Sequence, residues 1–392
     1  MSDPALPAWA REDAFPSKPD DGPYGTYDQK GKKEPFETLE ELKSHLESGK
    51  GRLAWVWVPE HKNLVAPEEV PALCGVLKKR QLLFAEEDGE EARRTLPFTG
   101  ILLAYAGYSA LRGARTFGYQ AFEFLVIMSL AALYFTARPW WESYKAKKEV
   151  AATTRATMAA EIPEARFDLW IGSQRSWFTL ILLGLVVMVG VAQFITPGKG
   201  IAEAGLVKEQ YRAGEFWRLF TAAFMHGNLI HFFLNASALW YLGRRVEILA
   251  RWPHLAAVFF LSIIGGGWAT VSWLPSQTSV GVSGVVCGLL GFLLVFETLH
   301  LPLVPRPARR RLSAILVSLV VIGIVGFQFI DNAAHFGGLV AGAAYAFLVF
   351  PKSSSPQRPA ILRRDYFVGG LALLFLVISA LGAVLVMTTM LK

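Results

Sequence analysis

The sequence has few cysteines and little charge for its length. Only two of its 392 residues are cysteines, and Cys74 and Cys287 form no C-x-x-C pair, so neither a disulfide framework nor a zinc site is predicted. Charged residues make up 18% of the chain, below the quarter or so that is typical of soluble domains. No H-E-x-x-H motif and no pair of aspartates in apolar segments occurs, which argues against zinc and aspartyl membrane proteases.

The charge is also unevenly distributed. The first 95 residues are slightly acidic, so the net charge of +7 comes from the more apolar remainder. Basic residues in short loops between apolar segments indicate membrane orientation, and we expect no nucleic-acid partner. The polar, acidic stretch from Met1 to Asp21 has no basic region followed by an apolar one. We therefore expect a cytosolic N-terminus.

The N-terminal quarter resembles a small soluble region. Residues 1–35 are rich in Pro, Gly, Asp and Lys, which favours a disordered lead. Residues 36–95 are predicted to form a small cytosolic α+β module, with a strand at 53–58 and a short helix at 67–80. The charged stretch 86–94 would link this module to the membrane part. We expect a regulatory or protein-binding appendage with a cytosolic partner.

The remainder of the chain predicts an all-α polytopic membrane protein, because about 20 helical residues cross the hydrocarbon core. The first predicted span is short and contains tyrosines, so it is either interfacial or half of a hairpin. The expected spans are 97–112, 118–137, 176–196, 228–248, 254–273, 283–299, 312–330, 334–350 and 367–390. The expected divisions are an extra membrane hairpin at 96–138, a basic cytosolic linker at 139–175, a six-helix core at 176–350, and a basic linker with an extra C-terminal helix at 351–392.

Lysine and arginine predict the orientation of these spans. Basic clusters occupy alternate connections, at 138–175, 244–251, 306–311 and 352–364, which places those connections on the cytoplasmic side. The connection 273–282 carries no charge, and 330–334 carries only Asp331. Ser283 and His335 are therefore predicted at the outer ends of their helices.

Polar residues gather at this same depth. Ser283 and His335 each begin an apolar segment, and a third helix brings His231 and Asn235, four residues apart on one face, with His226 just before them. A lone serine in a membrane helix is usually structural, a lone histidine less often so because histidine is rarer there, and the joint pattern favours hydrolysis. Ser283 would be the nucleophile and His335 its base.

The same residues include candidate donors for an oxyanion. The Ser283 N–H, His226 and the Asn235 amide could bind the negative oxygen of a tetrahedral intermediate. Asp331 lies in a loop, and no other acid completes a triad, so we predict a Ser-His dyad. No metal or cofactor is implied.

Glycines surround both candidate residues. Gly281 and Gly284 would let the backbone approach a substrate. Gly284 with Gly288 and Gly338 with Gly342 are small-x-x-x-small pairs, which allow two membrane helices to touch. Taken singly, each glycine is explained by packing alone.

At this point the sequence resembles the rhomboid intramembrane serine proteases over about residues 176–350. The matching motifs are G-x-S-G at 281–284, A-H-x-x-G-x-x-x-G at 334–342, the His226, His231 and Asn235 pattern, Trp217-Arg218, and Gly243 with Glu247. The resemblance implies Ser283 as nucleophile, His335 as base, His226 and Asn235 as oxyanion partners and His231 as a supporting residue.

The resemblance also implies partners and a location. Substrates would be single-span transmembrane proteins cut at or near the outer end of the span, and we expect a bacterial inner membrane with the N-terminus in the cytosol. The sequence departs from the family at Cys287, where many members have an aromatic residue that packs on the histidine. Phe336 is a candidate replacement.

Two alternatives stay open. The first is a catalytically silent rhomboid-like protein that binds membrane clients; such relatives lose the serine or the histidine, and both are present here. The second is a transporter, in which the pairing of serine and histidine would be accidental.

Overall fold

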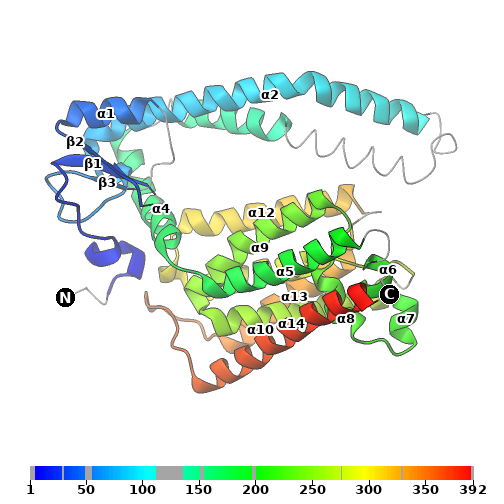
Figure 1. Ribbon diagram of the computed structural model, residues 1–392. Coiled ribbons are helices and arrows are strands. Elements are labelled where there is room, and N and C mark those ends of the chain that lie inside the picture. The colour runs from blue at the N-terminus through cyan, green and yellow to red at the C-terminus, as the bar shows by residue number, and fades with distance from the viewer. Residues whose placement is uncertain are drawn as a thin grey trace. The chain divides into compact units, whose positions relative to one another are not determined.

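The structure, a computed structural model, describes residues 5–28, 31–48, 55–111, 136–150, 154–196, 200–274, 276–327 and 330–389. It divides into two compact units, residues 9–173 and residues 174–392, with residues 5–8 grouped with the second. Figure 1 shows a small sheet in the first unit and a bundle of helices in the second.

A three-stranded antiparallel sheet forms the core of the first unit. Its strands β1 (Tyr24–Tyr27), β2 (Lys33–Phe36) and β3 (Trp55–Trp57) lie in the order β2-β1-β3. Helix α1 (Leu39–Glu47) begins after Thr38, whose hydroxyl accepts a hydrogen bond from the Glu41 N–H. Its buried face packs with the sheet into one apolar cluster.

The predicted disordered lead at residues 1–35 differs from this structure. β1 and most of β2 lie within it, as do two 3-10 turns, η1 (Ala8–Ala10) and η2 (Glu12–Ala14). Composition missed this order because a few aromatic side chains stabilise the segment: Trp9 and Phe15 are buried. Gly25 also leaves room for the ring of Trp57, which a Cβ there would overlap.

A helix of 38 residues, α2 (Cys74–Leu111), replaces the predicted short helix at 67–80. Residues 67–73 form two 3-10 turns, η3 (Pro67–Glu69) and η4 (Pro71–Leu73), because each begins with a proline that favours a tight first turn. The predicted charged link at 86–94 and residues 97–111 of the predicted span 97–112 belong to α2, which continues through Pro97, and residue 112 lies outside the described residues.

The second predicted span, 118–137, lies outside the described residues except for its last two positions. Residues 136–150 are helical, and α4 (Arg155–Ser173) follows. The basic stretch between the predicted spans is therefore largely helical where it is described.

The second unit is helical. Its main helices are α5 (Trp177–Ile195), α9 (Leu229–Ala250), α10 (Trp252–Trp273), α11 (Ser283–Leu299), α12 (Arg306–Val325), α13 (Asn332–Val349) and α14 (Arg363–Thr389). Between α5 and α9 lie the short helices α6 (Gly200–Ala204), α7 (Lys208–Arg212) and α8 (Arg218–Thr221) and the 3-10 turn η6 (Ala222–Phe224), and η7 (Leu301–Leu303) precedes α12.

Among the described residues, four helices are long and apolar enough to cross a membrane: α5, α10, α13 and α14. α11 is apolar but has 17 residues. The sequence predicted nine spans. The helices α9 and α12 occupy two of the predicted positions. The arginines at 306–311, predicted to lie in a connection, instead form the first turns of α12, and Arg244 and Arg245, also predicted in a connection, lie within α9.

Buried ion pairs and caps hold the bundle together. Arg245 of α9 donates two hydrogen bonds to Glu297 of α11, at 2.6 and 2.8 Å, and a third to the Ala308 carbonyl. Glu247 accepts from the N–H groups of Phe178 and Thr179 at the start of α5. A carboxylate there satisfies donors that a helix leaves free in its first turn.

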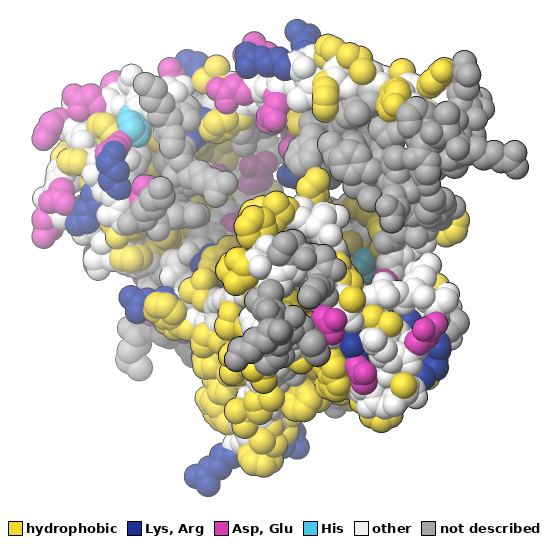
Figure 2. Space-filling view, turned by 45° about the vertical axis from the view of Figure 1, so that its right-hand side comes forward, with side chains coloured by type: hydrophobic (Ala, Val, Ile, Leu, Met, Phe, Trp, Pro, Cys, Tyr) yellow, Lys and Arg dark blue, Asp and Glu magenta, His cyan; other side chains and the backbone are white. Residues whose placement is uncertain are grey.

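Hydrophobic side chains cover much of the surface in Figure 2, where they form broad yellow areas. Many belong to α5, α12 and α14, whose exposed residues include Val191, Phe194, Val320, Ile324 and Leu371. An apolar exterior on long helices suits a lipid environment.

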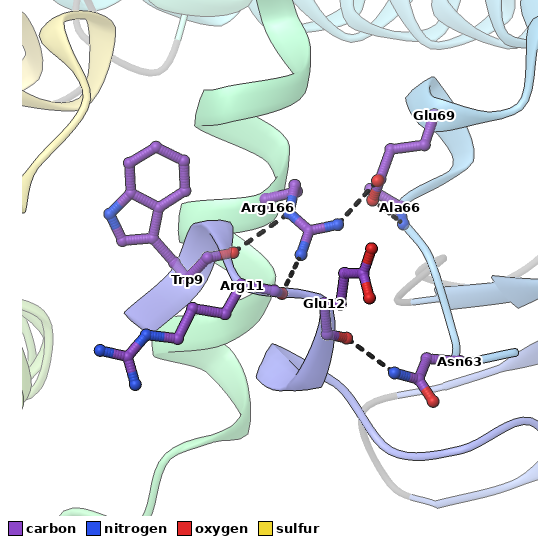
Figure 3. A network of polar contacts seen from close by, with 7 residues as sticks. All are labelled: Trp9, Arg11, Glu12, Asn63, Ala66, Glu69 and Arg166. Carbon is purple, nitrogen blue, oxygen red and sulfur yellow. Dashed lines mark hydrogen bonds and ion pairs between the residues drawn. The ribbon is translucent and has the colours of Figure 1, made fainter. Parts of the chain in front are cut away.

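In the first unit, Arg166 of α4 joins three separate segments (Figure 3). Its guanidinium donates to the carbonyls of Trp9 and Arg11 and to the carboxylate of Glu69. It also lies 4.9 Å from the ring centroid of Phe15. Arg166 is the contact that fixes the N-terminal segment to η3 and α4.

We expect Arg166→Ala to destabilise this unit by about 2 kcal/mol, because a largely buried carboxylate and two carbonyls lose a charged donor. Hydrogen exchange of the full-length protein should show faster exchange in peptides covering residues 8–14. Arg138→Ala is the control, since its ion pair with Glu142 is exposed. Unchanged exchange in Arg166→Ala would contradict this role.

Candidate active site

Ser283 and His335 lie together at the start of two packed helices. Ser283 is the first residue of α11, and His335 lies in the first turn of α13. The Ser283 Oγ and the His335 Nε2 are 2.8 Å apart, within hydrogen-bond distance of a nucleophile and its base.

The close contact of α11 with α13 sets this distance. A Cβ on Gly338 would overlap the Gly284 carbonyl oxygen, and a Cβ on Gly342 would overlap that of Gly288. One turn further on, a Cβ on Gly291 would overlap the Leu339 carbonyl oxygen. The two backbones are therefore in contact along several turns, which only residues without side chains permit.

The other predicted polar residues converge on Gly281, two positions before Ser283. Gly281 has a φ of +119°, a conformation that favours glycine. A Cβ built there would lie 2.8 Å from the His231 ring and 3.7 Å from the Asn235 amide nitrogen. The His226 ring lies beside His231, with ring centroids 5.3 Å apart.

Two of these residues have buried polar atoms without hydrogen-bond partners. Within the described part of the chain, the two ring nitrogens of His226 have no hydrogen-bond partner, and the amide nitrogen of Asn235 has none either. Burial lowers the pKa of His226, which lies in the loop before α9, to about 4. A neutral histidine keeps one N–H donor. Such orphaned donors in a native site call for an explanation.

Side chains that the sequence analysis did not single out hold this loop. Gln193 of α5 donates to the His226 carbonyl and accepts from the His226 N–H. Asn228 caps α9 by accepting from the His231 N–H at 2.8 Å. A capping signal was readable at Asn228, whereas no local pattern links Gln193 to a loop 33 residues away.

Asp331 does not extend the dyad to a triad. One of its carboxylate oxygens accepts from the Ala334 N–H and so caps α13, while the other accepts from the hydroxyls of Thr270 and Ser279. Those hydroxyls in turn accept from Lys208. Burial lowers the pKa of Lys208, and the charge of Asp331 acts in the opposite direction.

The long connection between α5 and α9 is braced by Arg218. Its guanidinium donates to Glu215 and to the carbonyls of Ala202 and Gly205, and it lies 4.7 Å from the ring centroid of Trp217. The Trp-Arg pair thus fixes the connection that carries Lys208.

Cys287 is buried and has a free thiol. Phe336, the candidate ring to replace an aromatic at that position, packs on Trp273 of α10 instead and is 53% exposed. As to metals, no three His, Cys, Asp or Glu side chains lie close enough to bind an ion among the residues described.

Comparison with known proteins places this site in a family. A rhomboid domain model matches residues 213–352. The chain is 35% identical over 139 residues to human inactive rhomboid protein 2, and 29% and 30% identical over 143 and 154 residues to RHOMBOID-like proteins 4 and 5 of Arabidopsis thaliana. Residues 213–352 of the chain form a rhomboid domain. This domain and the apolar helices indicate a multi-pass membrane protein.

The rhomboid match covers only part of each protein. It spans 35%, 36% and 38% of this chain and 16%, 36% and 48% of those three relatives, respectively. The rhomboid domain holds Ser283, His335, His226, His231 and Asn235, whereas residues 1–212 lie outside it.

We expect Gly338→Ala to separate the two rhomboid helices, because the new methyl group overlaps the Gly284 carbonyl. A loss of about 3 kcal/mol in stability is expected for such overpacking, with slower labelling of Ser283 by a fluorophosphonate probe. Gly382→Ala in α14 is the matched control, since a Cβ there meets no atom within 4 Å. Equal labelling of both variants and wild type would contradict the packing role.

Proposed function

We propose that this rhomboid protein is an intramembrane serine protease that uses Ser283 and His335 as a catalytic dyad. The observation that carries the proposal is the 2.8 Å contact between the Ser283 Oγ and the His335 Nε2. The unpartnered buried donors of His226 and Asn235 next to it support the same chemistry.

The reaction would proceed through an acyl-enzyme. The Ser283 Oγ attacks the scissile carbonyl carbon as its proton passes to the His335 Nε2, and the carbonyl oxygen becomes an oxyanion. The Ser283 N–H, His226 and Asn235 would donate hydrogen bonds to this oxyanion. The imidazolium then protonates the leaving amine, and a water activated by His335 releases the acyl group.

Single-span membrane proteins are the substrates that this site would suit. Ser283 and His335 each lie at the N-terminal end of a helix in an apolar bundle, so a substrate would be cut near one end of its span. The loop charges predict that this is the outer end. The assignment to a bacterial inner membrane stays a prediction, since the relatives compared are human, rat and plant proteins.

A second candidate is a catalytically silent protein that binds membrane clients. It is favoured by relatives named inactive rhomboid proteins 1 and 2, which are 30% and 35% identical to this chain over 139 residues. In that case the bundle would bind a transmembrane segment without cutting it.

To test the protease, wild type and Ser283→Ala are reconstituted in liposomes with a model single-span substrate. We expect Ser283→Ala to lower the rate of cleavage by at least about 10³-fold, because it removes the nucleophile. Ser318→Ala in α12 is the matched control, because its hydroxyl donates to the Ala314 carbonyl of its own helix. A fluorophosphonate probe should label wild type and Ser318→Ala alone.

Two outcomes would reject the proposal. Equal cleavage by wild type and Ser283→Ala would exclude the serine mechanism. Absence of cleavage and of labelling in wild type, with the substrate still bound, would favour the client-binding candidate.

The oxyanion role predicts a separate effect. We expect His226→Ala and Asn235→Ala each to lower kcat by about 10²- to 10³-fold with little change in KM, because the donors act mainly in the transition state. His61→Ala, in the first unit, serves as the control. A rise in KM with unchanged kcat would assign these residues to substrate binding instead.

A further inference from the structure

A largely buried polar cluster links four segments near the site. It consists of Lys208 of α7, Thr270 of α10, Ser279 in the connection before α11, and Asp331 at the start of α13. Lys208 is 2% exposed and Thr270 is fully buried. The Lys208 ammonium lies 2.9 Å from both hydroxyl oxygens, and each hydroxyl donates to the same oxygen of Asp331.

Two members of this cluster lie close in sequence to the two residues of the dyad. Ser279 precedes Ser283 by four residues, and Asp331 precedes His335 by four. The Asp331 carbonyl accepts from the His335 N–H at 3.0 Å, and the Asp331 side chain caps the same helix. Ser279 is further paired with Leu206 through two backbone hydrogen bonds, next to Lys208.

The charges of Lys208 and Asp331 explain why the hydrogen bonds of this cluster are needed. A buried ammonium and a partly buried carboxylate need hydrogen-bond partners, and the two hydroxyls between Lys208 and Asp331 supply these. Each hydroxyl accepts from Lys208 and donates to Asp331, so loss of either charge leaves the other with an incomplete set of partners. The segments before Ser283 and His335 are therefore joined directly by the hydrogen bond from Ser279 to Asp331, and Lys208 supports this contact by donating to the Ser279 and Thr270 hydroxyls.

We propose that Lys208 and Asp331 are positioning residues that set the contact between Ser283 and His335 through Ser279 and the cap of α13. This rests on the proposed protease function. Neither residue touches the reacting atoms, and their effect would come through the geometry of the dyad, where a misplacement of about 1 Å can cost about 10²-fold in rate.

The test compares Lys208→Met, Asp331→Asn and the double variant in the full-length protein in liposomes. Asn keeps an acceptor for the α13 cap, and Met keeps the apolar stem of lysine. We expect each single variant to lower kcat by about 10- to 100-fold with KM changed less than about threefold. The decrease in kcat of the double variant should be much smaller than the product of the two single-variant decreases, because residues in one network are coupled.

Glu209→Gln is the matched control, since it removes an exposed charge from the same short helix. The proposal would be overturned if the two substitutions changed kcat independently of each other. It would also be overturned if kcat per folded molecule were unchanged in both single variants. Ser279→Ala replaces either variant that fails to fold and should lower kcat in the same way.

Hydrogen exchange separates this proposal from the proposed function. In a Ser283→Ala background, Lys208→Met should speed exchange of amides in residues 276–283 and 331–335, whether or not the wild type cleaves a substrate. Unchanged exchange there would overturn the positioning role, while failure of wild type to cleave or be labelled would reject the protease alone.

Discussion

The rest of the site depends on the backbone contact between α11 and α13. Lipid gives two apolar helices no hydrophobic reason to associate, so close packing and hydrogen bonds must hold them together. Gly284, Gly288, Gly338 and Gly342 let the two backbones touch. Once they touch, Ser283 and His335 have little freedom to separate, because each lies in the first turn of one of these helices. Arg245 and Glu297 tie the other end of α11 to α9 with a buried ion pair.

The polar groups of the bundle are of two kinds. Most have complete sets of partners: Glu247 caps α5, Asp331 caps α13, and Lys208 bonds two hydroxyls. His226 and Asn235 differ, because their buried polar atoms have no partner among the described residues. Gln193 bonds only the backbone of His226, whose ring packs between the rings of His231 and Phe232. The Asn235 amide lies next to Gly281, two residues before Ser283, whereas Ser262 of α10 also has a buried hydroxyl without a partner among the described residues.

Much of the site could be predicted from the sequence because its signals are local. Ser283, His335 and the glycine pairs stand out within apolar segments, and helical spacing joins His231 to Asn235. Lys208, Gln193 and the hydroxyls of Thr270 and Ser279 could not be predicted, since their contacts join residues 33 to 71 positions apart. In the fold, Pro67 and Pro71 delayed α2 beyond the predicted start. The predicted span at α9 included Arg244, Arg245 and Glu247, and α12 begins six residues before the predicted span 312–330, so that arginines predicted in a connection form its first turns.

Similarity to rhomboid proteins does not distinguish a protease from a catalytically silent protein that binds membrane clients. The local geometry is therefore the basis for testing the protease first. The similarity to inactive rhomboid protein 2 covers 16% of that protein, and most of its length has no counterpart in the match. A protein that only bound clients would gain nothing from a serine hydroxyl held 2.8 Å from an imidazole. It would also bear the cost of leaving buried donors unpaired, about 1–3 kcal/mol for each group. Hydrolysis gives both features a use, because the hydroxyl attacks and the donors receive the charge that develops.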